Sequence, residues 1–269
     1  MEYSKLLEAH KRYGTTTEDI IKYREYGKIL DTVVITPWWE HSMFENQNVE
    51  IKQEGTRLYN IKGDEFEFSF IQLKLIGAPA IMDYILSLGV TKCNNIIFLG
   101  SAGSLDENIK IGDLVVPDYS ICGDGASRYL NDNLEDEFGK KEYPDEELTE
   151  ILKLKMKSEA EVYKIRAHNE ANFSVDSVFA QFAHIDYIKN TGAKVIEMET
   201  ALVFKCAKMC NIKSTALLCI SDNTLVKKSL YSGRSNEENQ YRHMVRKSII
   251  PKIIIDVVKD IQKSNKTNY

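Results

Sequence analysis

The chain has 269 residues, of which 43% are hydrophobic and 28% charged, a composition that excludes a disordered or collagen-like chain. Its 35 Lys and Arg against 40 Asp and Glu give a net charge of −5, and the absence of a basic block argues against nucleic-acid binding. No apolar run approaches the ~20 residues of a membrane span, and the charged N-terminus lacks the apolar core of a signal peptide. We therefore expect a cytoplasmic protein with no membrane partner.

The five cysteines form no CxxC pair, and such a set is expected to remain as free thiols in a reducing compartment. The histidines are scattered and no HExxH motif occurs. The sequence therefore predicts neither a metal site nor an organic cofactor.

Residues 1–28 have the pattern of polar helices, and we interpret them as a helical N-terminal extension. From residue 29 onward apolar runs alternate with helical patterns, which is typical of an α/β domain with a largely parallel sheet. We expect a single domain over 29–269. The predicted strands cover 31–36, 66–75, 95–99, 113–120, 195–198 and 214–220. The predicted helices cover 78–88, 146–157, 199–209 and 236–263, the last interrupted at Pro251. Pro117 indicates an edge strand or a bulge.

Two acidic motifs follow predicted strands. Glu197-Met198-Glu199 stands at a strand-to-helix junction, where a carboxylate can accept hydrogen bonds from a vicinal diol. The helix dipole also favours acidic residues at this place, which explains Glu199 better than Glu197. Ser221-Asp222-Asn223 ends the strand over 214–220. A buried aspartate there can act as a general acid, and a helix cap or turn is the structural alternative.

Three further features are weaker. Gly100 to Ser104 follows a predicted strand, and such a small-residue turn can bring backbone amides close to an oxyanion or a sugar. Trp38 and Trp39 can line an aromatic wall or close the end of the core, and core packing is the default interpretation. The basic group of Arg242, Arg246 and Lys247 is interpreted as a solvated helix face.

Taken together and in this order, NIIFLGSAGSL, IKIGDLVVPD, GDGAS, DSVF, VIEMETALVF and ISDN make a sequence that resembles the nucleoside phosphorylase and nucleosidase superfamily. The resemblance runs from about Asp31 to Asn223. It implies a three-layer α/β/α sandwich with a mixed, partly barrel-like central sheet. It also implies a homodimer or a hexamer built as a trimer of dimers, and cleavage of the N-glycosidic bond of a small-molecule nucleoside.

The resemblance also implies roles for single residues. Glu199 would bind the ribose hydroxyls, with Met198 packing beneath the sugar. Asp222 would protonate the leaving purine, with Ser221 beside it. Further substrate-binding candidates are Ser101, Ala102 and Gly103 in the small-residue turn, Val178 and Phe179 where the family stacks the base, and Glu197.

The chain departs from the phosphorylase pattern where the family binds phosphate. Phe98 stands at the place of an arginine, and the loop Pro37 to Ser42 contains none. The acceptor of the sugar is therefore left open between phosphate, as a co-substrate, and water. Hydrolytic members of the superfamily use a glutamate after the first strand, and Glu40 is the catalytic candidate for that role. Arg57, Lys74 and Arg128 are candidates for a non-standard phosphate site.

The sequence also allows two other interpretations. The lost phosphate ligands also fit a catalytically inactive family member that binds a nucleoside. A flavodoxin-like protein outside the family would require the order of the motifs to be accidental.

Overall fold

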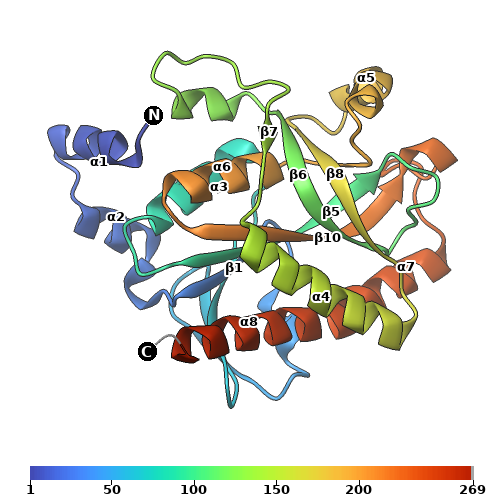
Figure 1. Cartoon of the computed structure of the whole chain (residues 1–269), viewed down its shortest axis with the longest axis horizontal. Helices are drawn as coiled ribbons and strands as arrows, with labels where there is room; N and C mark the ends of the chain where they lie inside the picture. The colour runs from blue at the N-terminus through green and yellow to red at the C-terminus, as the bar shows by residue number, and fades with distance from the viewer. Residues whose placement is uncertain (268–269) are drawn as a thin grey trace.

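The computed structural model describes residues 1–267, and Figure 1 shows how its helices and strands are arranged. The strands are β1 (Thr32–Thr36), β2 (Glu50–Gln53), β3 (Leu58–Lys62), β4 (Glu67–Gln72), β5 (Asn95–Ser104), β6 (Leu114–Gly123), β7 (Lys141–Glu142), β8 (Ala167–Val175), β9 (Val195–Glu197) and β10 (Lys213–Asn223). The α-helices are α1 (Tyr3–Arg12), α2 (Thr17–Arg24), α3 (Ala78–Leu88), α4 (Glu146–Tyr163), α5 (Ile185–Asn190), α6 (Thr200–Met209), α7 (Asn236–Met244) and α8 (Ile250–Thr267). Short 3-10 turns cover Tyr26–Lys28, His41–Phe44, Ala126–Leu130, Ala180–His184 and Thr224–Val226, and a π-helical turn covers Val245–Ile249.

The sheet is mixed and part of it closes into a barrel. Its strands follow the order β10-β6-β8-β9-β5-β1-β4-β3-β2, and β10 also pairs with β5. That extra pairing joins the two ends of the run from β10 to β5, so these strands form a closed ring without an edge. The remaining strands extend the sheet outward, with β1 parallel to both β5 and β4 and a β2–β3–β4 meander beyond. The expected mixed, partly barrel-like sheet is confirmed.

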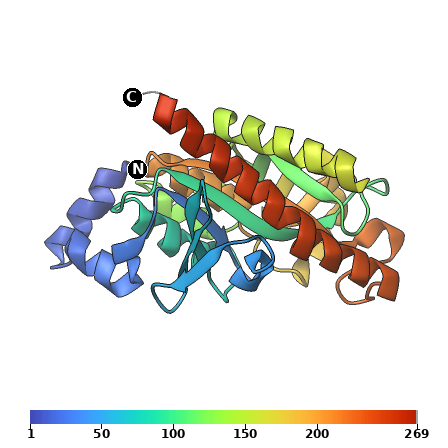
Figure 2. The same ribbon diagram turned by 90° about the horizontal axis from the view of Figure 1, so that it is seen from below.

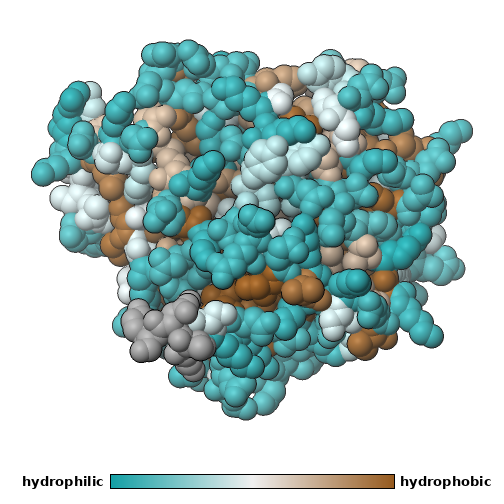
Figure 3. Space-filling model, viewed as in Figure 1, coloured by the Kyte–Doolittle hydropathy of each residue, from teal (hydrophilic) through white to brown (hydrophobic). Residues whose placement is uncertain are grey.

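Helices cover both faces of the sheet. α3 and α6 pack together on one face, where Ile81, Ile85 and Phe204 join the buried side chains of β1, β5 and β10. α4 and α8 lie side by side on the other face, as Figure 2 shows, and Leu152 and Ile253 are buried beneath them. This arrangement is the predicted three-layer sandwich. The face in Figure 3 is mostly hydrophilic, with a short apolar strip over α4 and α8.

The predicted strands near the site are longer than the sequence indicated. The small-residue stretch Gly100 to Ser104 is not a turn, because β5 continues through it. It does so by pairing with β10, whose Asp222 and Asn223 lie opposite Gly103 and Ser104. Hydrogen bonding to a neighbouring strand thus holds residues that by composition favour a turn.

Other differences lie outside the site. β8 was not predicted, because its sequence AHNEANFSV has a polar first half. Pro117 marks a bulge, shown by a register shift between Pro117 and Tyr119 in the pairing of β6 with β8. It does not mark an edge, since β6 pairs with β10, β8 and β7. The interruption predicted for the last helix is found just before Pro251, because a π-helical turn over Val245–Ile249 separates α7 from α8 and Pro251 lies in the first turn of α8.

The first helices dock at one end of the molecule, beside α3 (Figure 1). The Tyr3 hydroxyl donates to the carbonyl oxygen of Leu86 at 2.5 Å. The Tyr3 ring occupies the space where Gly89 lacks a side chain, since a Cβ there would lie 2.7 Å from it. α1 is thus held on the core by an aromatic side chain, although none of its residues is fully buried.

All five cysteines are free thiols, as expected. Among residues 1–267, no helix is long and apolar enough to cross a membrane. The same part of the chain contains no cluster of His, Cys, Asp and Glu suited to a metal ion.

Candidate functional site

A cavity of about 330 Å³ opens at the carboxyl ends of β1, β5 and β10. This is the edge of a parallel sheet where α/β proteins bind ligands, and the volume suits a small organic ligand. Its lining comes from strand ends and from the segment after β10: Thr36, Pro37, Trp38, Trp39, Ile76, Gly100, Ser101, Gly103, Val178, Gln181, Ile196, Glu197, Met198, Glu199, Ser221, Asp222, Leu230, Arg234 and Arg242.

Glu197 supports the wall of this cavity. One carboxylate oxygen accepts hydrogen bonds from Asn172 Nδ2 at 2.7 Å and Ser174 Oγ at 2.5 Å. The other accepts from the backbone amides of Glu199 at 2.7 Å and Thr200 at 2.8 Å. These amides open α6, where a carboxylate satisfies donors that have no partner within the helix. With four donors already bound, Glu197 acts on the shape of the site, and its proposed contact with substrate stays a prediction.

Glu199 is buried and has few partners. Its Oε1 accepts from the backbone amide of Gly77 at 2.6 Å. Gly77 adopts φ +90° at the start of α3, which glycine tolerates best. Burial, and then the neighbouring Glu197 charge, raise the pKa of Glu199 to about 8. Glu199 is also one of the residues that line the cavity, so its carboxyl group can accept a hydrogen bond from a ligand hydroxyl.

Ser221 and Asp222 both line the cavity because β10 bulges between Ile220 and Asp222. The Ser221 hydroxyl donates to Asp222 Oδ1 at 2.5 Å. Gly103 leaves the room for this carboxyl group, since a Cβ there would lie 3.1 Å from Asp222 Oδ2. Burial raises the pKa of Asp222, against the opposing effects of the Ser221 hydrogen bond and of nearby Arg234 and Arg242. A carboxyl group in this state is suited to donate a proton.

Arginines from the segment after β10 complete the site. Arg242 Nη2 donates to Ser101 Oγ at 2.7 Å, and Arg234 Nη1 donates to the carbonyl oxygen of Ser221 at 2.9 Å. The interpretation of Arg242, Arg246 and Lys247 as a solvated face is therefore wrong. Arg242 lines the cavity, and Lys247 donates to Ser42 Oγ at 3.1 Å. The helical spacing of Arg242 and Arg246 beside the apolar Val245 and Ile249 is the sequence signal from which an inward face could have been predicted.

The two tryptophans contribute both to the core and to the wall of the cavity, the two roles considered for them. Trp39 is 3% exposed and belongs to the core, whereas Trp38 is 57% exposed, and both line the cavity. The guanidinium carbon of Arg246 lies 5.0 Å from the centroid of the Trp39 ring. This distance is that of a cation–π contact, made to a ring that also lines the cavity.

The remaining predicted residues lie at different distances from the cavity. Val178, Met198 and Gly103 line it. Ala102 is buried behind it, and its carbonyl oxygen accepts from the Ser221 hydroxyl at 3.2 Å. Phe179 is 80% exposed and packs edge-on against Tyr231.

Glu40 lies on the surface and is not among the residues that line the cavity. Its Oε2 accepts from the Ser42 hydroxyl at 3.4 Å. Its role as a base stays a prediction that would require the side chain to turn toward the cavity.

None of the three other cations suggested for a phosphate site lines this cavity. Arg57 lies near the ring of Tyr84 in a separate depression, and Arg128 pairs with Asp136 at 3.6 Å. Lys74 is exposed in the turn after β4. The non-standard phosphate site suggested for these three residues therefore stays a prediction.

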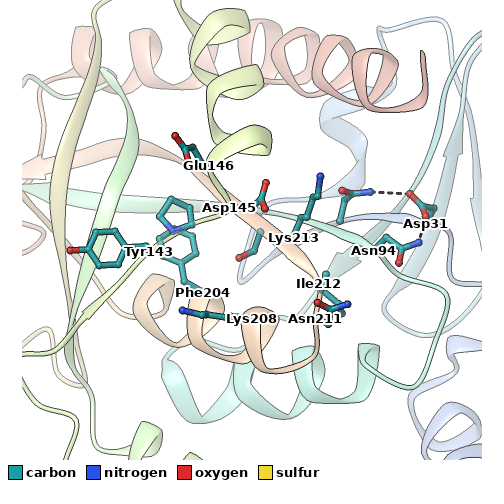
Figure 4. Close-up of a pocket in the computed structure, with 13 residues that line it drawn as sticks. Asp31, Asn94, Tyr143, Asp145, Glu146, Phe204, Lys208, Asn211, Ile212 and Lys213 are labelled. Carbon is teal, nitrogen blue, oxygen red and sulfur yellow. Dashed lines mark hydrogen bonds between the residues drawn. The ribbon is translucent and has the colours of Figure 1, made fainter. Parts of the chain in front are cut away.

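A larger hollow of about 1030 Å³ lies at the opposite, amino-terminal ends of β1, β5 and β10. Figure 4 shows the polar side chains around it, several of which are already paired. Asp31 accepts from Asn94 and Asn95, and the Asp145 side chain caps α4. These pairings stabilise strand starts and a helix terminus, so the smaller cavity is the candidate site.

Comparisons with known proteins identify relatives of this chain. A family model described as the phosphorylase superfamily matches residues 47–248. The DeoD-type purine nucleoside phosphorylase of Bacillus velezensis is 25% identical over 207 residues, which cover 75% of this chain and 86% of the relative.

Two solved structures show the same fold. The purine nucleoside phosphorylase of Toxoplasma gondii in complex with immucillin-H aligns with a TM-score of 0.69 and 16% identity, over 93% of this chain and 94% of that chain. The AMP nucleosidase of Bacteroides thetaiotaomicron aligns with a TM-score of 0.64 and 17% identity, over 93% of this chain and 99% of that chain.

Proposed function

The chain belongs to the phosphorylase superfamily, and from that premise we propose that it cleaves the N-glycosidic bond of a nucleoside, with purine nucleosides favoured. The observation that carries the proposal is the meeting of two buried carboxyl groups, Glu199 and Asp222, in one cavity. The name of the Bacillus velezensis relative, a purine nucleoside phosphorylase, supports the choice of base.

The two carboxyl groups would have different roles in the reaction. Glu199, fixed by the Gly77 amide, accepts hydrogen bonds from the ribose hydroxyls. Asp222 donates its proton to the purine as the bond between C1′ and the base nitrogen breaks. The electrons of that bond leave with the base, and an oxygen of the acceptor bonds to C1′. Protonation of the leaving group contributes about 10²–10⁴-fold in such reactions.

The acceptor is either water or phosphate. Hydrolysis through Glu40 is the alternative that the sequence raised, and the surface position of Glu40 does not favour it. We also propose that the protein works in the cytoplasm and forms a homodimer or a hexamer. Light scattering on the purified protein would test the oligomeric state. Neither a metal nor an organic cofactor enters the proposal.

The test is product analysis on inosine, guanosine, adenosine, methylthioadenosine and uridine, each with and without phosphate. We expect release of a free purine base by the wild type and its loss in Asp222→Asn. Ribose 1-phosphate formed only with phosphate identifies a phosphorylase, and free sugar in either buffer identifies a nucleosidase. No base from any substrate would overturn the proposal and favour the inactive, nucleoside-binding alternative.

A further inference from the structure

The cavity has an excess of positive charge at one end. Arg242 lines it, and Arg246 lies above Trp39, which also lines it. Within residues 1–267 neither guanidinium has a carboxylate close enough for an ion pair. The ion pairs of this part of the chain are made by other cations: Met1, Lys5, Arg24, Lys52, Arg128, Lys140, Lys153, Lys155, Arg166, His168, Lys194, Lys205, Lys213 and Lys228. Burial of a cation without an anion is unfavourable.

The hydrogen-bond partners show the same deficit. The Nε atoms of both Arg242 and Arg246 are buried without a partner. Arg242 Nη2 donates to Ser101 Oγ at 2.7 Å, and its other side-chain partner is the Cys219 thiol, so both partners are uncharged groups. Burial lowers the pKa of both guanidinium groups, and the charges of nearby arginines lower it further, Arg234 acting on Arg242, and Arg242 with Arg234 acting on Arg246. Asp222 and Glu40 act on these arginines only at longer range.

The carboxyl groups of the cavity do not balance this charge. Glu197 is bound by four neutral donors. Burial and the Glu197 charge raise the pKa of Glu199 to about 8, so Glu199 is largely uncharged at neutral pH. An anionic ligand would therefore supply the missing partner.

We infer that Arg242 and Arg246, together with the Ser101 hydroxyl, form a binding site for a phosphate group, in place of the arginines that the sequence lacks at Phe98 and in the loop Pro37 to Ser42. Guanidinium groups bind phosphate through charge-assisted, often bidentate hydrogen bonds. Both arginines come from the segment of α7 and the π-helical turn after it, far in sequence from the loops where the resemblance places phosphate ligands.

The position of the site relative to Asp222 fits a nucleoside ligand. Ser101 lies two residues before Gly103, and Gly103 lies opposite Asp222 in the pairing of β5 with β10. Two residues along a strand span about 7 Å. This backbone spacing leaves room for about one sugar between a base at Asp222 and a phosphate at Ser101.

Two sources of phosphate satisfy this geometry. One is inorganic phosphate, whose oxygen would bond to C1′ as the base leaves with the Asp222 proton. The other is the 5′-phosphate of a nucleoside monophosphate, in which case water is the acceptor and its second proton goes to solvent. The reaction written for each source rests on the proposed function, whereas binding of the phosphate group can be tested without it.

The test measures binding directly, by isothermal titration calorimetry in a phosphate-free buffer, with inorganic phosphate, AMP and adenosine as probes. Arg242→Gln is compared with Arg12→Gln, an exposed arginine of α1 that lies outside the cavity and carries the same charge change. We expect Arg242→Gln to weaken binding of the preferred phosphate probe by roughly 10- to 100-fold, the range for a lost charged hydrogen bond. Arg246→Gln should weaken it less, and Arg12→Gln should leave it unchanged.

The probes separate the two sources. Saturable binding of inorganic phosphate assigns the site to a co-substrate. Binding of AMP much more tightly than adenosine, with that preference lost in Arg242→Gln, assigns it to a phosphate ester. Equal affinities in the wild type and Arg242→Gln, or no binding of either phosphate probe to the wild type, would overturn the inference. Circular dichroism of Arg242→Gln and of Arg242→Lys, which keeps the charge, separates lost binding from lost folding. Binding that depends on Arg242 in a protein that releases no base would instead refute the proposed function alone.

Discussion

Glu197 accepts a hydrogen bond from the backbone amide of Glu199 at 2.7 Å. The two carboxyl groups therefore lie in the same buried segment, but they have different numbers of hydrogen-bond donors. Glu197 has four donors, whereas Glu199 has the Gly77 amide and a raised pKa. The same chemical change at the two positions should therefore have opposite consequences for stability and for activity.

We predict that Glu197→Gln lowers the free energy of unfolding by about 3 kcal/mol, because its amide group would face donors that now bind a carboxylate. Glu199→Gln should leave that free energy nearly unchanged but lower kcat/KM by about 100-fold, since the carboxyl group that would hold the ribose hydroxyls is replaced by an amide with a different set of donors and acceptors. Chemical denaturation and steady-state kinetics on both variants test this. Equal losses of stability in the two variants would contradict the division of roles.

The Glu199 pKa predicts how stability depends on pH. Its pKa rises from 4.5 to about 8 on folding because of burial and the Glu197 charge. Between these values the folded protein binds the proton and the unfolded chain releases it, so this contribution to stability is full below about 4.5 and is lost as pH rises through about 8. Denaturation at pH 5, 6, 7 and 8 should show a decline that is smaller in Glu199→Gln. The control is Glu8→Gln, at an exposed position of α1, which should keep the decline of the wild type.

Asp222 should be required for turnover but not for folding. We predict that Asp222→Asn lowers kcat by about 10²–10⁴-fold, the usual contribution of a general acid. Its thermal midpoint should not fall, because the change removes a carboxyl group whose ionisation burial disfavours. Asp64→Asn, in the exposed turn between β3 and β4, is the matched control. An Asp222→Asn enzyme with wild-type kcat would exclude Asp222 as the acid.

Arg234 should set the pH range in which Asp222 can donate its proton. The Arg234 charge lowers the pKa of Asp222 against the effect of burial. Arg234→Gln should therefore raise that pKa, and the alkaline limb of the kcat/KM profile, where the acid loses its proton, should move to higher pH. Kinetics from pH 5 to 9 test the direction. A limb that stays in place, or moves to lower pH, would show that another group controls it.

The sequence and the structure agree on the acidic residues of the site for a physical reason. Glu199 and Asp222 each follow an apolar strand, and the carboxyl ends of neighbouring parallel strands meet at one edge. Arg242 could not be placed in that way. It comes from a helix whose polar composition is typical of a solvated surface, and its contact with Ser101 spans 141 positions. Similarly, the strand character of Gly100 to Ser104 depends on pairing with β10 and not on its composition.

The N-terminal segment should contribute to stability and not to catalysis. The Tyr3 hydroxyl bonds to the Leu86 carbonyl at 2.5 Å, at the end of α3, and Tyr3 does not line the candidate cavity. Tyr3→Phe should lower the free energy of unfolding by about 1 kcal/mol, the usual net value of one hydrogen bond, and leave kcat and KM unchanged. Tyr13→Phe is the control, because Tyr13 is 82% exposed and the same loss of a hydroxyl should have no effect there. A fall in kcat with unchanged stability in Tyr3→Phe would instead mean that α1 acts on the active site.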